Sequence, residues 1–179
     1  MSVRITYVTH STTTDSEAGS ATGWNPGVLS ALGLEQAREL GERYAEARFD
    51  SIYVSDLARA VDSATIAFGA GAFRLDPRLR ECNYGTRNGT PIARAERIEH
   101  AIEPFPSGES YADVVERMRA LLLDLSARHQ GEHVLLVAHS APRVALDHLL
   151  NRVPLAEAVA LPNECQPGWS YLVPDETDL

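Results

Sequence analysis

Residues 3–14 read VRITYVTHSTTT, where a run of apolar and β-branched residues gives way to His10 among hydroxyl side chains. Residues 134–141, VLLVAHSA, repeat this pattern and place His139 directly after a second apolar run. Short apolar runs of this kind are typical of buried strands. The sequence therefore predicts two strands that each end in a histidine, and the two histidines could share one site.

The segments around these strands alternate between strand-like and helix-like patterns. Further strands are predicted at residues 52–54, 72–75 and 170–173. Apolar residues at helical spacing predict a helix that Ser30 caps and that runs through Ala47, and further helices at residues 57–68, 111–129 and 141–150. This alternation predicts an α/β fold, a three-layer α/β/α sandwich with a mainly parallel central sheet.

Length and composition narrow the function. With 179 residues and 44% hydrophobic content, the chain is expected to form a single domain over residues 1–179. The formal net charge of −9 disfavours a nucleic-acid partner. All sixteen basic residues are arginine, which excludes a Schiff-base or P-loop lysine, and no cofactor is expected. Without a leader-like or membrane-spanning pattern, we expect a cytoplasmic protein with no membrane partner.

Three candidate site residues follow predicted strands. Ligands of parallel sheets bind beyond the carboxyl ends of the strands, where His10 and His139 both lie. Either histidine alone is better explained as a loop or cap residue bonded to the backbone, but their matching contexts favour a shared site. Residues 53–64, YVSDLARAVDSA, place Arg59 in the first turns of a helix near the same edge, either as a surface residue or as an anion ligand.

The order and spacing of several segments resemble the histidine phosphatase superfamily, which includes phosphoglycerate mutase-like enzymes and small phosphomonoesterases. The segments are VTHSTTT at 8–14, LSALGLEQARELGERY at 29–44, VSDLARAVDSA at 54–64, RLRECNYG at 78–85, FPSGESYADVVERM at 105–118 and LLVAHSAPRVAL at 135–146. The resemblance covers nearly the whole chain and implies the phosphoglycerate mutase-like fold.

The resemblance also implies roles for four catalytic residues. His10 would be the nucleophile that becomes phosphorylated, Arg59 would hold the phosphoryl oxygens, and His139 would stabilise the transition state. Glu81 would protonate the leaving oxygen and then activate water. Without the family pattern, Glu81 is better explained as an exposed glutamate paired with Arg78 or Arg80.

The chemistry of these residue types agrees with those roles. A neutral imidazole can attack phosphorus and leave a phosphohistidine that water opens. Phosphoryl transfer depends mainly on positioning and electrostatic stabilisation, so cationic side chains can serve in place of a metal ion. We expect no metal in the site. A glutamate that acts as an acid must hold a proton near neutral pH, which burial or the nearby phosphate dianion would favour.

The chain departs from the family pattern at the nucleophile. The usual Arg-His-Gly is replaced by Thr9-His10-Ser11, and one charge-assisted contact to an anion is worth about 1.5 to 3 kcal/mol. The usual asparagine six residues after the nucleophile is also replaced by a serine. An arginine four residues after the second histidine could supply the missing charge, or it could lie on the solvated side of its helix. The candidate substrate-binding residues are therefore Thr9, Ser11, Ser16, Ser140 and Arg143.

The favoured function is a metal-independent phosphomonoesterase that acts on a small phosphorylated metabolite. The alternative is a catalytically weakened phospho-ligand binding protein of the same fold. A mutase-type phosphotransferase is less favoured, because residues 86–110, the expected cap over the site, leave little room for a substrate-retaining segment. A serine hydrolase and a metal hydrolase carry little weight, because no G-x-S-x-G or H-E-x-x-H pattern occurs. A strand near residues 169–173 could provide a homodimer contact, which the sequence leaves open.

Overall fold

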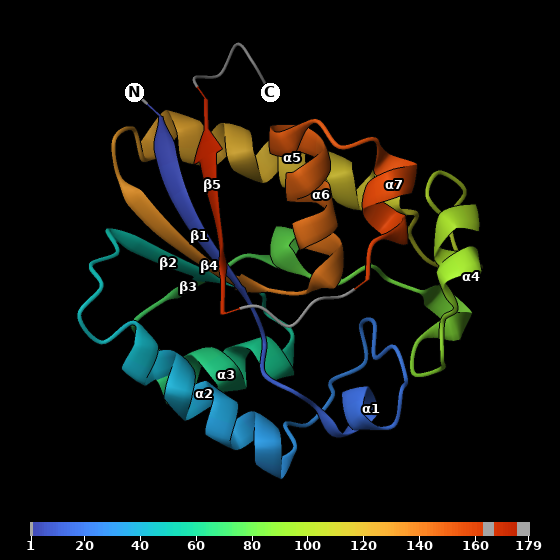
Figure 1. Ribbon diagram of the computed structural model, residues 1–179, viewed down its shortest axis with the longest axis horizontal. Coiled ribbons are helices and arrows are strands. Elements are labelled where there is room, and N and C mark those ends of the chain that lie inside the picture. The colour runs from blue at the N-terminus through green and yellow to red at the C-terminus, as the bar shows by residue number, and fades with distance from the viewer. Residues whose placement is uncertain (1, 163–166, 175–179) are drawn as a thin grey trace.

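A computed structural model describes residues 2–162 and 167–174 (Figure 1). Its centre is a five-stranded sheet in which β3, β2, β4 and β1 are parallel and β5 is antiparallel to β1. In sheet order the strands are β3 (Arg74–Leu75), β2 (Ser51–Val54), β4 (His133–Ala138), β1 (Val3–Thr9) and β5 (Trp169–Val173). The predicted mainly parallel α/β sheet is confirmed, although the strand predicted at residues 72–75 is only two residues long.

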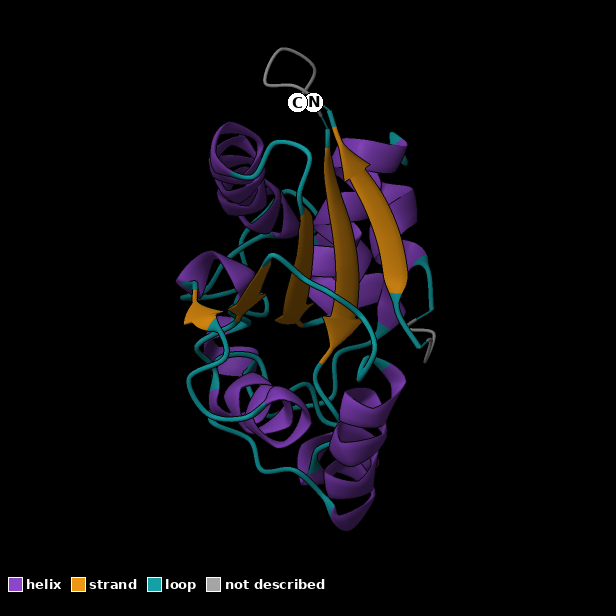
Figure 2. Cartoon of the chain, turned by 90° about the vertical axis from the view of Figure 1, so that its left-hand side faces the viewer, coloured by secondary structure: helices purple, strands orange, loops and turns teal. Residues whose placement is uncertain are grey.

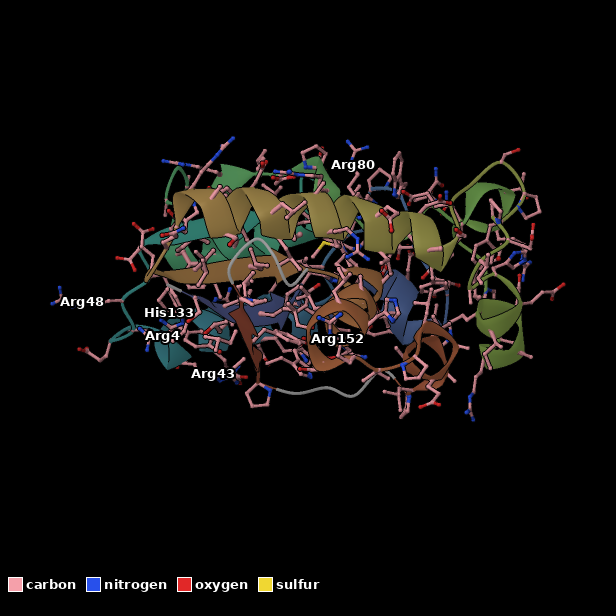
Figure 3. The ribbon with its side chains drawn as sticks, turned by 90° about the horizontal axis from the view of Figure 1, so that it is seen from above. Arg4, Arg43, Arg48, Arg80, His133 and Arg152 are labelled. Atoms are coloured by element: carbon pink, nitrogen blue, oxygen red, sulfur yellow. The ribbon has the colours of Figure 1, made fainter. Side chains whose placement is uncertain are left out.

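Helices cover both faces of this sheet (Figures 1 and 2). On one face lie α2 (Ala31–Arg43) and α3 (Ala58–Phe68); on the other lie α5 (Tyr111–Arg128), α6 (Ser140–Asn151) and α7 (Leu155–Ala160). Figure 3 shows α5 lying across the sheet. These helices and the sheet form the predicted three layers.

The central strand β4 shows why both faces must be covered. Its alternate residues Val134, Leu136 and Ala138 belong to one buried cluster, which includes side chains of α5 and α6. Leu135 and Val137 belong to the second cluster, which includes side chains of α2 and α3. Successive side chains of a strand point to opposite faces, so an uninterrupted apolar run requires a layer of helices on each side.

The start of α2 fixes the loop that follows His10. The Ser30 hydroxyl accepts a hydrogen bond from the N–H of Gly33 at 3.1 Å, as expected of an N-cap. A Cβ atom on Gly33 would lie 1.9 Å from the carbonyl oxygen of Thr12, so this close approach requires glycine. The helix ends at Arg43, before the predicted Ala47, where Tyr44 turns to pack edge-on against Phe49.

Several short elements were not predicted. They are α1 (Thr14–Glu17), α4 (Arg94–Glu99), α7, and two 3₁₀ turns, η1 (Pro77–Leu79) and η2 (Gly85–Arg87). The segment at residues 86–110 contains α4, and its Thr90 forms an isolated bridge with Ala21 of the loop after β1. These two loops therefore meet beside the carboxyl edge of the sheet.

Two further observations concern the surface of the fold. Within residues 2–162 and 167–174, no helix is both long and apolar enough to cross a membrane. β5 is an edge strand of the sheet, and a homodimer contact through it stays a prediction.

Candidate active site

The ends of three neighbouring strands bring the predicted histidines together. β1 and β4 pair in register through Thr9 and Ala138, so His10 and His139 leave the sheet side by side. The N–H of His10 continues the ladder by donating to the carbonyl of Ala138 at 2.9 Å, and the two imidazole centroids are 5.0 Å apart. β2 lies on the other side of β4 and ends just before Ser55. The predicted site is therefore formed by strand ends at one edge of the sheet.

The hydrogen bonds of His10 define its protonation state. Its Nδ1 lies 2.7 Å from the carbonyl oxygen of Ser11, which can only accept, so Nδ1 carries the proton. Nε2 then has a free electron pair and accepts a hydrogen bond from Nε of Arg59 at 3.2 Å. Burial, followed by the charge of Arg59, lowers the pKa of His10 from 6.5 to about 3. His10 is therefore neutral near pH 7, with the electron pair on Nε2, as a nucleophile requires.

Arg59 is a buried cation, with only 1% of its surface exposed. Besides His10, its guanidinium donates to the carbonyls of Asn25 and Gly23 at 3.1 and 2.8 Å. Among the residues that the structure describes, no carboxylate forms an ion pair with Arg59. Burial lowers its pKa, and the nearby Glu81 carboxylate opposes this shift. Since a guanidinium has five N–H donors, two remain for an anion that would offset the cost of burying the charge.

His139 is completely buried and held from two neighbouring strands. The hydroxyl of Tyr7 in β1 accepts from the His139 backbone N–H at 3.1 Å and donates to the His139 carbonyl. The imidazole Nε2 lies 2.8 Å from the hydroxyl of Ser55, which also accepts from the N–H of Leu57 at 3.3 Å. Burial, then the charge of Arg59, lowers the pKa of His139 well below its usual value, so the ring is neutral.

These contacts allow one tautomer of His139 that suits an anion. A serine hydroxyl has one proton and two acceptor sites, so Ser55 can donate to Nε2 of His139 while it accepts from Leu57. In that tautomer the ring proton sits on Nδ1, a buried nitrogen with no hydrogen-bond partner within the described part of the chain. It would give His139 an unused N–H donor beside His10, suited to an oxygen of a bound phosphoryl group.

Glu81 follows η1 and reaches the start of α6. One carboxylate oxygen accepts from the N–H groups of Cys82 and Ala141, both at 2.9 Å, and the other accepts from the N–H of Ser140 at 3.2 Å. The carboxylate therefore caps α6 at its positive end. It is only 7% exposed.

The alternative of an exposed Glu81 paired with a neighbouring arginine is wrong. Arg78 instead pairs with Asp76 and Asp124, and Arg80 pairs with Asp56 at 2.6 Å. Both arginines are thereby held by other acids, which leaves Glu81 facing the site.

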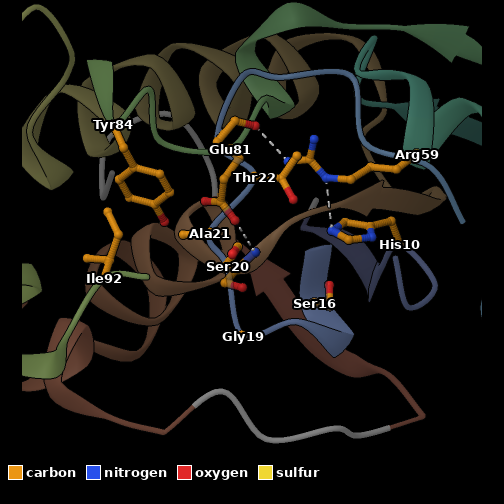
Figure 4. Close-up of a pocket in the computed structure, with 12 residues that line it drawn as sticks. His10, Ser16, Gly19, Ser20, Ala21, Thr22, Arg59, Glu81, Tyr84 and Ile92 are labelled. Atoms are coloured by element: carbon orange, nitrogen blue, oxygen red, sulfur yellow. Dashed lines mark hydrogen bonds between the residues drawn. The ribbon is translucent and has the colours of Figure 1, made fainter. Parts of the chain in front are cut away.

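Three of the catalytic candidates, His10, Arg59 and Glu81, line one cavity of about 300 Å³, and His139 lies buried beside His10 without being among its lining residues. Figure 4 shows His10 and Arg59 close together on one side and Tyr84 and Ile92 on the other. The residues that line the cavity are His10, Ser16, Gly19, Ser20, Ala21, Thr22, Gly23, Arg59, Glu81, Tyr84, Ile92 and Ser140. Among the predicted substrate-binding residues, Ser16 and Ser140 therefore lie in its wall. Ile92 brings the segment at residues 86–110 into the same wall.

Two predicted binding residues lie elsewhere. Ser11 is buried, and its N–H donates to the hydroxyl of Ser63 at 2.9 Å, so it anchors the loop after His10. Thr9 lines a separate cavity of about 270 Å³ behind His10, together with residues of α2 such as Arg43. Neither of them is among the residues that line the main cavity.

Arg143 does not supply the charge that Thr9 lacks. Its guanidinium pairs with Asp147, one turn along α6, at 2.7 Å, and lies over the ring of Trp169 at 5.2 Å. Tyr171 and Asn151 donate to the other carboxylate oxygen of Asp147. Arg143 is 7% exposed, so it is not on the solvated side of the helix either. It is part of a buried network that joins α6 to β5.

The sequence interpretation missed Ser55 and Tyr7, which contact His139, and Ser63, which holds the loop after His10. Ser55 could have been found, because it follows a predicted strand in the same way as His10 and His139. Tyr7 and Ser63 gave no such signal, since their contacts join segments far apart in the chain.

The comparisons with known proteins agree with this geometry. Residues 5–176 match the histidine phosphatase superfamily (branch 1), and the chain belongs to this family. A probable phosphoglycerate mutase of Proteus mirabilis is 32% identical over 165 residues, 84% of this chain and 74% of the relative. A metal-independent phosphoserine phosphatase of Arabidopsis thaliana is 31% identical over 75% of this chain and 63% of its own. A mycobacterial glucosyl-3-phosphoglycerate phosphatase solved with VO3 aligns with a TM-score of 0.79 at 30% identity, over 89% of this chain and 87% of its own.

Proposed function

We propose that this protein is a metal-independent phosphomonoesterase that hydrolyses a small phosphorylated metabolite through a phosphohistidine. The observation that carries the proposal is the pair formed by His10 and Arg59. A neutral imidazole with a free electron pair lies 3.2 Å from a buried cation that no carboxylate neutralises within the described residues. Such a pair suits a phosphoryl group, whose oxygens need the cation and whose phosphorus needs the nucleophile.

The reaction would proceed in two displacements. Nε2 of His10 attacks phosphorus, the P–N bond forms, and the P–O bond to the leaving group breaks while Glu81 gives that oxygen a proton. Glu81 then removes a proton from water, whose oxygen attacks phosphorus and breaks the P–N bond, which releases phosphate and restores His10. Arg59 and the unused N–H of His139 would bind the phosphoryl oxygens in both steps.

The relatives support hydrolysis of a small molecule. Two of those described above are phosphatases, named for phosphoserine and for glucosyl-3-phosphoglycerate, and one is named a probable mutase. We place this chain among the small phosphatases, as a variant with Thr9-His10-Ser11 at the nucleophile. Its expected partner is the phosphorylated substrate, and its expected location is the cytoplasm.

The first experiment is hydrolysis of p-nitrophenyl phosphate and a panel of phosphorylated metabolites in the presence of EDTA. We expect turnover that survives chelation and disappears in His10→Ala. Activity that requires an added metal ion, or that persists in His10→Ala, would contradict the mechanism.

The alternative is a phospho-ligand binding protein whose catalytic rate is greatly reduced because Thr9 carries no charge. It predicts that phosphate binds to the wild type and that no compound in the panel is turned over. The survival of His10, Arg59, Glu81 and His139 in one arrangement favours the enzyme.

A further inference from the structure

A smaller cavity of about 80 Å³ adjoins the candidate active site. It shares Ala21, Tyr84, Ile92 and Ser140 with the main cavity. Figure 4 places two of these shared residues, Tyr84 and Ile92, opposite His10. The side chains that only the smaller cavity contains are those of Arg97, Tyr111, Val144 and Val159. A substrate whose phosphate lies at His10 would therefore reach this cavity with its other end.

The polar groups of this cavity are incompletely satisfied. Nε of Arg97 in α4 is buried and has no hydrogen-bond partner among the described residues. No carboxylate within those residues forms an ion pair with Arg97. A buried N–H of a charged group without a partner is costly, and native structures rarely leave one without a function. The position of Arg97 thus indicates an anionic ligand.

Two buried tyrosines complete the polar wall. Tyr84 and Tyr111 are 6% and 4% exposed, both line this cavity, and their hydroxyls lie near each other. Each hydroxyl has one proton that it can donate to a ligand. Burial, followed by the charge of Glu81, raises the pKa of Tyr111, so the phenol stays protonated, and the charge of Arg97 opposes this shift from close by.

We infer that this smaller cavity binds a carboxylate of the substrate, with Arg97 and the Tyr84–Tyr111 pair as donors. The inference rests on the proposed function and narrows it to phosphomonoesters that carry a carboxylate. A volume of about 80 Å³ equals two or three water molecules at roughly 30 Å³ each, which suits a carboxylate. A second phosphate would bring more charge than one guanidinium can balance, and apart from Ser140 the remaining lining residues, Ala21, Ile92, Val144 and Val159, are apolar.

A matched pair of compounds tests this inference. 3-Phosphoglycerate and glycerol 3-phosphate differ in having a carboxylate or a hydroxymethyl group at the far end. We expect kcat/KM to favour 3-phosphoglycerate by about 10- to 100-fold, the size expected for a hydrogen bond to a charged group. Arg97→Gln should remove most of this preference. Arg94→Gln is the control, because Arg94 is exposed on the same helix and lines neither cavity.

Inhibition and binding measurements test the inference if a variant does not fold or if the wild type hydrolyses no substrate. In the wild type, free glycerate should inhibit hydrolysis of p-nitrophenyl phosphate competitively, and glycerol should not, which requires no variant to fold. If p-nitrophenyl phosphate is hydrolysed but both phosphate esters have equal kcat/KM, the carboxylate site is wrong and the proposed function stands. If nothing is hydrolysed, the proposed function fails. Calorimetry then decides the carboxylate site alone, since equal affinities for the two esters would overturn it.

Discussion

His10 and His139 have similar sequences around them and different surroundings in the fold. Each follows an apolar strand and precedes a serine, and the two strands pair directly. His10 is half-buried, with its proton fixed on Nδ1 by a carbonyl and its electron pair next to Arg59. His139 is fully buried, with Nε2 bound to Ser55 and Nδ1 without a partner among the described residues.

The difference shows that the strand end sets where each imidazole lies, at the carboxyl edge of the sheet. The hydrogen-bond partner of the ring then determines whether the imidazole offers an electron pair or a proton. A ring whose proton is used by a carbonyl presents an electron pair, and a ring whose electron pair is used by a hydroxyl presents a proton. In the proposed reaction the first ring attacks phosphorus and the second binds its oxygens. Each prediction below tests one part of this division.

The largest effect should separate the two histidines. We expect His10→Asn to lower turnover by about 10⁴-fold or more and to abolish the phosphoenzyme, since no other group can form the P–N bond. His139→Asn should lower turnover by about 10²- to 10³-fold, the cost of one transition-state donor, and still be phosphorylated. Phosphorus NMR after alkaline quenching would detect the phosphohistidine. A phosphoenzyme in His10→Asn would reverse the two roles.

Ser55 should matter through the tautomer of His139. We expect Ser55→Ala to lower kcat/KM by about 10- to 100-fold, because the ring proton is no longer held on Nδ1. Nitrogen-15 NMR of the imidazole should show the proton moving toward Nε2, and Ser55→Thr should restore both signals. Ser126→Ala is a matched control, since Ser126 is equally buried but donates to the Pro174 carbonyl away from the site. If the tautomer of His139 is unchanged in Ser55→Ala, Ser55 does not determine it.

The distance along the chain between a residue and its partners explains which features could be predicted from the sequence. The strand ends at His10 and His139 follow from local patterns, because an apolar run and the polar residue after it lie next to each other in the chain. The caps by Ser30 and Ser110 are local in the same way, through side chains that bind the N–H three residues on. Local patterns therefore predicted the layers of the fold and the edge of the sheet that holds the site.

Contacts between distant segments could not be predicted. The Glu81 carboxylate binds N–H groups about sixty residues away, at the start of α6. Arg143 finds an acid on its own helix, and only the neighbouring β5 shows that this pair is buried. The choice among several oppositely charged partners depends on packing that no spacing rule contains.

On the His139 side, Arg143 should act on stability. We expect Arg143→Met to lower the free energy of unfolding by about 2 kcal/mol, because it leaves the buried Asp147 without its cation. Urea unfolding measures this loss, and calorimetry with phosphate should show an affinity within about twofold of the wild type. Arg59→Met, which should lose phosphate binding, is the control. A large loss of affinity in Arg143→Met would make this arginine the substitute for the missing charge.

On the His10 side, Thr9 should limit affinity. We expect Thr9→Arg to tighten phosphate binding by about tenfold, since a second guanidinium beside the site adds one charge-assisted contact. Thr9→Gln has a similar length without the charge and controls for bulk. If neither variant differs from the wild type, position 9 does not reach the phosphate and the departure from Arg-His-Gly has no electrostatic consequence.

The smallest effect concerns stability against pH. The pKa of His10 is lowered from 6.5 to about 3 on folding, so the unfolded chain binds more protons than the folded one between these values. The contribution of His10 is therefore complete above about pH 6.5 and is lost as the pH falls toward 3. His10→Asn does not titrate, so from pH 7 to about 5.5 it should lose about 1 kcal/mol less stability than the wild type. Urea unfolding at both pH values measures the difference. Equal losses would mean that folding does not lower the pKa of His10, which would contradict its burial beside the cation of Arg59.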